Sequence, residues 1–166
     1  MQYTRRRFLG ASALAVGSGL AGCTNAANQQ ELTVETLAVG GLRGGPLVVQ
    51  PTDRPVLLDF FATWCAPCKP QMSDLGEIRA RYGPDQLHML SVTWERDEAV
   101  VRGFWEEYRG SWPVAMDPEV TTGERYGVQN LPTLLVFTPE GKEVWRHVGL
   151  AGLSSIEAAL ARAGVE

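Results

Sequence analysis

Side chains that bind transition metals are scarce in this sequence, which has two histidines and three cysteines among 166 residues. A structural zinc site normally needs four ligands, often two cysteine pairs or cysteine and histidine at close spacing. Cys65 and Cys68 form one such pair, whereas His88 and His147 each stand alone inside an apolar strand pattern. We therefore expect no metal site and interpret both histidines as ordinary strand residues.

The sequence is also poor in positive charge. Residues 1–22 hold three of its 15 basic residues and none of its 19 acidic residues. Without that segment, 12 basic and 19 acidic residues remain, which gives a net charge of about −7. Because proteins bind nucleic acid through basic patches, this balance argues against a nucleic-acid partner.

No apolar run near the N-terminus is long enough to span a bilayer. The small and apolar run from Gly10 to Leu20 has 11 residues, whereas a membrane-spanning helix needs roughly 20. It follows the basic stretch Thr4-Arg5-Arg6-Arg7-Phe8-Leu9, which has a twin-arginine signature. This layout favours an export signal at residues 1–22 over a retained transmembrane anchor.

Leu20-Ala21-Gly22-Cys23 resembles a lipobox, the motif after which lipoproteins are cut and then lipidated on the new N-terminal cysteine. We expect Cys23 to be a lipid anchor; the alternative is a spare thiol in a discarded signal. Residues 23–31 are rich in Asn, Gln, Ala and Thr, which predicts a flexible tether. A single domain then follows at residues 32–166.

Strand and helix signals alternate through that domain and indicate an α/β protein with a mixed central sheet and helices on both faces. The glycine-rich stretch 40–45 lacks the Lys-Ser/Thr ending of a phosphate loop, so it predicts turns between short strands. The final helix is expected to be capped by Ser154 or Ser155. Strands are expected at 56–61, 87–92, 134–137 and 144–148, and helices at 69–82, 97–108, 118–126 and from about 154.

The chemistry centres on Cys65-Ala66-Pro67-Cys68, which joins a buried strand to the start of a helix. Unpaired backbone N–H groups and the helix dipole favour a thiolate there. Pro67 suits the first helical turn, where its missing N–H has no cost. A thiolate beside a second thiol is equipped for exchange with a disulfide.

The surrounding residues resemble the thioredoxin superfamily. The stretch from Asp59 to Lys69 is followed about 60 residues later by Leu131-Pro132-Thr133. The chain resembles the anchored TlpA/ResA-like branch of this superfamily in three features. These are the export signal, the motif Thr63-Trp64-Cys65 and an insertion between Leu87 and Val128. The resemblance covers about residues 32–166 and implies a thioredoxin fold with an N-terminal extension.

The resemblance also implies roles for the site residues. Cys65 would be the nucleophile and Cys68 the resolving cysteine, with no cofactor beyond this redox pair. Pro132 would have a cis peptide bond that exposes the Leu131 backbone to an extended substrate; the alternative is an ordinary trans proline at a strand start. Trp64 is expected to pack beside the thiols and shield them from water.

Asp59 is a carboxylate within an apolar strand, where burial is costly without a partner or a role. The resemblance implies a buried acid that exchanges a proton with the resolving cysteine, and desolvation should raise its pKa. The alternative is an Asp at a strand edge in contact with water. Gln71 stands where the anchored branch often has Glu and cannot titrate, and Glu95 is a weaker candidate that we interpret as a surface acid.

These features together predict an exported, membrane-tethered thiol–disulfide oxidoreductase on the outer face of the cytoplasmic membrane. Its substrates would be protein thiols and disulfides, and Ala66-Pro67 resembles the reducing members. A reductant outside the cell needs a membrane electron donor, and the family likeness suggests cytochrome c maturation or disulfide repair. The alternatives are a thiol peroxidase and a non-catalytic binding lipoprotein, although no proline lies in the seven residues before Cys65.

Overall fold

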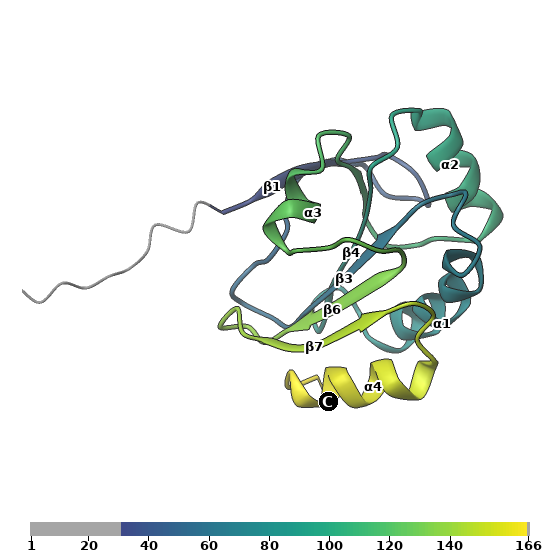
Figure 1. Ribbon diagram of the computed structural model, residues 1–166. Helices are drawn as coiled ribbons and strands as arrows, with labels where there is room; N and C mark the ends of the chain where they lie inside the picture. The colour runs from purple at the N-terminus through teal and green to yellow at the C-terminus, as the bar shows by residue number, and fades with distance from the viewer. Residues whose placement is uncertain (1–30, 166) are drawn as a thin grey trace, which may run out of the picture.

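The computed structural model describes residues 31–165, and the expected export signal, Cys23 and nearly all of the tether lie outside this range. A seven-stranded sheet forms its centre, in the order β2-β1-β5-β4-β3-β6-β7. Figure 1 shows α4 beneath β7 and alongside α1, with α2 and α3 at the opposite end of the molecule. The strands are β1 (Thr33–Thr36), β2 (Gly45–Val48), β3 (Val56–Phe61), β4 (His88–Thr93), β5 (Val114–Met116), β6 (Thr133–Phe137) and β7 (Glu143–Val148), and the helices are α1 (Cys68–Arg81), α2 (Glu98–Glu107), α3 (Thr121–Arg125) and α4 (Leu153–Arg162).

Strand β3 is an interior strand of the sheet, between β4 and β6, and all six of its residues are buried. It pairs with β4 in parallel and with β6 in antiparallel orientation, so the sheet is mixed as expected. A strand covered on both faces has a continuous apolar sequence, and only Asp59 interrupts this one. The chain leaves the C-terminal end of β3 and enters α1 after a short turn. The two cysteines lie at this junction.

The two faces of the sheet are covered unequally. Leu57 and Phe61 of β3 point into a core that α1, α2 and α4 share. Val56, Leu58 and Phe60 point to the other face, where they belong to a second apolar cluster with residues of β1, β2 and the end of α3. Helices lie on both faces, as the sequence predicts, but three of the four lie on the cysteine side.

Most expected elements match the structure to within a residue or two, and three expectations need correction. Strand β5 was not expected, because it has only three residues and follows Pro113. Helix α3 begins at Thr121 rather than near Pro118, since Asp117 accepts hydrogen bonds from the first backbone N–H groups. Helix α4 begins at Leu153 with Gly152 at its N-cap, so neither expected serine caps it.

The glycine-rich stretch forms the turns between β1 and β2, as the sequence predicts. Gly44 has a φ of 68°, and a Cβ there would lie 2.7 Å from the Thr36 carbonyl oxygen, so only glycine fits without strain. Within residues 31–165, the structure has no helix with the length and apolar character that a bilayer crossing requires.

Candidate active site

The two cysteines lie at the junction between β3 and α1. Cys65 is in the turn after β3, Cys68 is the first residue of α1, and a disulfide joins them with a Cα–Cα distance of 5.3 Å. Pro67 occupies the N-cap with a φ of −72°, compatible with helix entry. Once reduced, the pair lies beside the free N–H groups of the first helical turn, which favour a thiolate.

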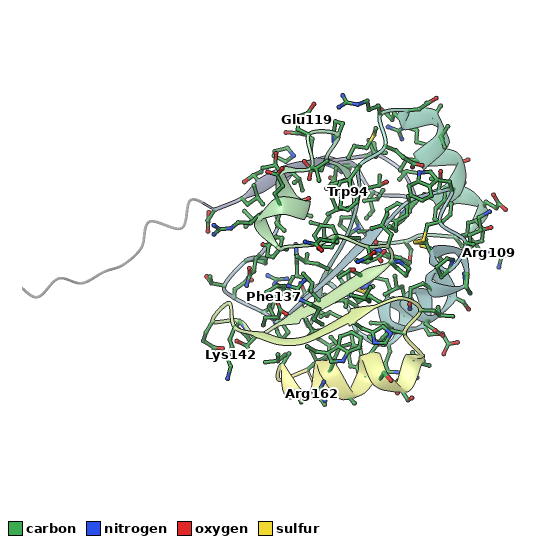
Figure 2. The ribbon with its side chains drawn as sticks, in the orientation of Figure 1. Trp94, Arg109, Glu119, Phe137, Lys142 and Arg162 are labelled. Atoms are coloured by element: carbon green, nitrogen blue, oxygen red, sulfur yellow. A yellow bond between two sulfur atoms is a disulfide. The ribbon has the colours of Figure 1, made fainter. Side chains whose placement is uncertain are left out.

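A surface groove of about 380 Å³ opens beside Cys65 but does not reach Cys68. Trp94 forms one side of it and packs on α3, where a Cβ at Gly123 would lie 2.8 Å from its ring (Figure 2). Every lining residue is uncharged, which suits an apolar or neutral polypeptide segment. The lining residues are Trp64, Cys65, Ala66, Pro67, Trp94, Gln129, Asn130 and Leu131.

Trp64 differs from its expected role. It lines the groove next to Cys65, but 74% of the residue is exposed to solvent. It therefore presents most of its apolar surface to solvent, more than the expected shielding role implies. Cys65 itself is only 5% exposed.

The peptide bond between Leu131 and Pro132 is cis, as the family resemblance implies. Leu131 lines the groove, and β6 begins directly afterwards at Thr133. The Thr133 hydroxyl donates to the Asn130 carbonyl at 2.7 Å, and the Gly149 N–H donates to the Pro132 carbonyl at 2.8 Å. These bonds fix the loop that faces Cys65 across the groove.

Asp59 is buried in β3 and does not lie at a wet strand edge. Only 3% of it is exposed, and it faces the side of the sheet that α1 covers. The Ser91 hydroxyl donates to its Oδ2 at 2.7 Å, whereas Oδ1 has no hydrogen-bond partner among the described residues. Burial raises the pKa of Asp59 to about 7, and the Ser91 hydrogen bond opposes that rise in part.

Glu95 is not the surface acid that the sequence suggests. It is half-buried after β4, and its Oε1 accepts hydrogen bonds from the Thr63 N–H at 3.2 Å and from the Thr63 hydroxyl at 2.5 Å. Thr63 lies two residues before Cys65. Glu95 therefore holds the turn that carries the first cysteine.

Gln71 connects two elements of the fold through hydrogen bonds and has no part in proton transfer. It is 1% exposed, donates to the Ala151 carbonyl at 3.1 Å and accepts from the Ala151 N–H at 2.8 Å. This pair of bonds joins α1 to the loop before α4. A glutamate here would direct a carboxylate oxygen at the Ala151 carbonyl, so the amide suits both partners.

The four candidate zinc ligands are not brought together. His88 lies on β4 and His147 on β7, and strands β3 and β6 separate them. Burial lowers the pKa of His88 to about 4, while His147 stacks on Trp145 with ring centroids 5.5 Å apart. Among the residues that the structure describes, no group of three or more His, Cys, Asp or Glu side chains lies close enough to hold a metal ion.

The structure also adds residues that sequence reasoning missed. Ser91 is the partner of Asp59, and Trp112 in turn donates to Ser91. Ser91 was visible as the one small polar residue within an expected apolar strand, but its pairing with Asp59 depends on the strand register. Nothing in the sequence singles out Trp112, because it approaches from a loop 21 residues later.

Comparison with known proteins agrees with this architecture. The family model described as Redoxin matches residues 48–160. A thiol-disulfide oxidoreductase ResA of Bacillus cereus is 30% identical over 94 residues, which is 57% of this chain and 54% of ResA. The chain spans about half the length of the curated relatives that it matches.

Two solved structures show the same fold. The exposed lipoprotein thioredoxin Etrx1 of Streptococcus pneumoniae has a TM-score of 0.64 and 28% identity, covering 79% of this chain and 99% of that one. StoA of Bacillus subtilis also has a TM-score of 0.64, with 16% identity over 77% of this chain and 94% of StoA.

The mixed sheet, the Cys65–Cys68 pair at the start of α1 and the cis proline opposite it define a protein of the thioredoxin superfamily. Within that superfamily the chain belongs to the Redoxin family and is ResA-like. The thioredoxin fold expected from the sequence is thereby confirmed.

Proposed function

We propose that the protein is a thiol–disulfide oxidoreductase that exchanges disulfides with other proteins through Cys65 and Cys68. The carrying observation is that Cys65, not Cys68, faces an open uncharged groove bounded by the cis-proline loop. An extended segment of a partner protein fits such a groove, and the Leu131 backbone offers it hydrogen bonds. The similarity to ResA supports this activity.

In the proposed reaction, the Cys65 thiolate attacks one sulfur of a partner disulfide. A mixed disulfide forms, and the second partner sulfur leaves as a thiolate. The Cys68 thiolate then attacks Cys65 Sγ, which closes the Cys65–Cys68 disulfide and releases the reduced partner. Two electrons pass to the partner, and the protein is oxidised.

Asp59 would take the proton from the Cys68 thiol during the second step. It lies on the sheet face that α1 covers, and α1 begins at Cys68. A buried acid with a pKa of about 7 can exchange a proton near neutral pH. In this proposal the Cys65–Cys68 pair carries the electrons, and Asp59 carries the proton.

We infer that the protein acts as a reductant, because Ala66-Pro67 is similar to the dipeptide of reducing relatives. A membrane protein would supply its electrons, and its targets would include apocytochromes c or misoxidised exported proteins. Equilibration of the full chain with glutathione or dithiothreitol buffers, followed by alkylation, gives the potential of the Cys65–Cys68 pair. A value of about −270 mV supports a reductant, and a value of about −120 mV supports an oxidant instead.

We also infer that Cys23 is lipidated and holds the protein on the outer face of the cytoplasmic membrane. The lipobox-like residues before it support this, and so does the similarity to a lipoprotein thioredoxin. A Cys23→Ser change should move the protein from the membrane fraction to the soluble fraction of the cell. Retention of the serine variant in the membrane fraction contradicts the lipid anchor.

A further inference from the structure

A chain of hydrogen bonds leads from the loop before β5 to Asp59. The Trp112 indole N–H donates to the Ser91 hydroxyl oxygen at 2.8 Å, and the Ser91 hydroxyl lies 2.7 Å from Asp59 Oδ2. Ser91 is fully buried and Trp112 is 1% exposed. Of the three residues that these hydrogen bonds connect, only Asp59 is titratable.

The donors and acceptors of these hydrogen bonds are fixed. An indole nitrogen can only donate, so Ser91 must accept from Trp112. A serine hydroxyl has one proton, and Asp59 Oδ2 is the acceptor that lies within its reach. Ser91 therefore donates to the carboxylate, which leaves Oδ1 as the oxygen to take a proton.

Few other polar groups face Asp59. From α1, the buried face presents Cys68 and Gln71, of which only the thiol of Cys68 titrates after reduction. Across β6, His147 lies two strands away, with Leu134 between it and Asp59. The buried faces of α2 and α4 carry no charged side chain: they present Val101, Phe104, Trp105, Ile156, Ala159 and Leu160.

We propose that Ser91, with its proton directed by Trp112, is a positioning residue that sets the pH at which Asp59 exchanges its proton. This inference rests on the proposed role of Asp59 toward Cys68. Donation by Ser91 stabilises the charged carboxylate in a site where no cation of the described residues does so. Without it, Asp59 would hold its proton at a higher pH and would accept one from Cys68 less often.

The surrounding packing keeps this donor in place. The Ser91 N–H donates to the Pro113 carbonyl at 3.0 Å, next to Trp112, so backbone and side-chain bonds join the same two segments. The Trp105 indole N–H donates to the Trp112 carbonyl at 3.1 Å. A Cβ at Gly110 would lie 2.3 Å from the Trp105 ring, so this packing also requires glycine.

The test is a pH titration of the Asp59 carboxyl carbon by NMR in the oxidised full-length protein labelled with ¹³C-aspartate. The signal is assigned by its loss in Asp59→Asn. In Ser91→Ala the midpoint should rise by about one pH unit, a roughly tenfold gain in proton affinity. Ser91→Thr keeps the hydroxyl and should return the midpoint to near the wild-type value, and Trp112→Phe should raise it by less than Ser91→Ala.

Thr93→Val is the matched control, because it removes a fully buried hydroxyl from the same strand whose hydrogen bond is with the Glu95 N–H and not with Asp59. An unchanged midpoint in Ser91→Ala, or an equal rise in Thr93→Val, overturns the proposal. An unchanged midpoint in Trp112→Phe overturns the part assigned to Trp112. Since the oxidised protein has no free Cys68 thiol, these outcomes do not depend on whether the protein exchanges disulfides.

Discussion

A Cys65→Ser protein should reduce insulin disulfides at least ~1,000-fold more slowly than the wild type, because a serine hydroxyl cannot replace the attacking thiolate. Cys65 is the cysteine that lines the open groove, so the remaining Cys68 thiol is poorly placed to attack a partner. The measurement is the initial rate of insulin reduction with dithiothreitol as the electron source, corrected for the rate without protein.

The Cys68→Ser variant is the matched control for this experiment. It keeps the nucleophile and lacks the resolving thiol, so it should accumulate a mixed disulfide with the substrate. Non-reducing electrophoresis detects that species. Accumulation in Cys65→Ser instead would reverse the two roles, and a wild-type rate no higher than the rate without protein would favour the non-catalytic binding protein.

The thiol peroxidase alternative makes a different prediction for the same proteins. A peroxidase needs a pocket for peroxide at its reactive cysteine, whereas the groove beside Cys65 is open and lined by two tryptophans. Consumption of hydrogen peroxide by the wild type, at rates exceeding insulin reduction, would favour the peroxidase.

Local patterns were sufficient to predict the centre of the fold. The apolar run at Val56–Phe61 predicts β3 with the same first and last residues that the structure has, since burial on both faces leaves a continuous hydrophobic sequence. The cysteine spacing and Pro67 likewise place the start of α1 to within a residue. Strand β5 was missed because its three residues carry no period that distinguishes them from a loop.

The site was predictable only where its residues are close in sequence or match a family motif. The cysteine pair, the cis bond at Pro132 and the burial of Asp59 follow from such signals. Ser91 and Trp112 could not be assigned, because their contacts arise from strand register and a loop far away in sequence. Glu95 was assigned to the surface for the same reason, since its contact with Thr63 spans 32 residues.

An Asp59→Asn protein should be more stable than the wild type above pH 7 by roughly 2–4 kcal/mol. Burial raises the pKa of Asp59 from 3.8 to about 7 in the folded protein. Between these values the folded protein keeps a proton that the unfolded chain has lost, so the free energy of unfolding falls as pH rises from about 4 to about 7. Asparagine carries no charge and avoids this loss, and its carbonyl can still accept the Ser91 hydrogen bond.

The measurement is urea unfolding of the oxidised proteins from pH 4 to pH 9, with the disulfide intact in both states. Near pH 4 the two proteins should have similar free energies of unfolding, and their difference should grow up to about pH 7 and then level off. The depressed pKa of His88 makes folding weaker in acid, but it acts on both proteins alike and cancels in the difference. Asp85→Asn removes a carboxyl at an exposed position before β4 and serves as the matched control. A constant difference between Asp59→Asn and wild type across this range would show that the Asp59 carboxyl does not carry the raised pKa on which its proposed proton transfer depends.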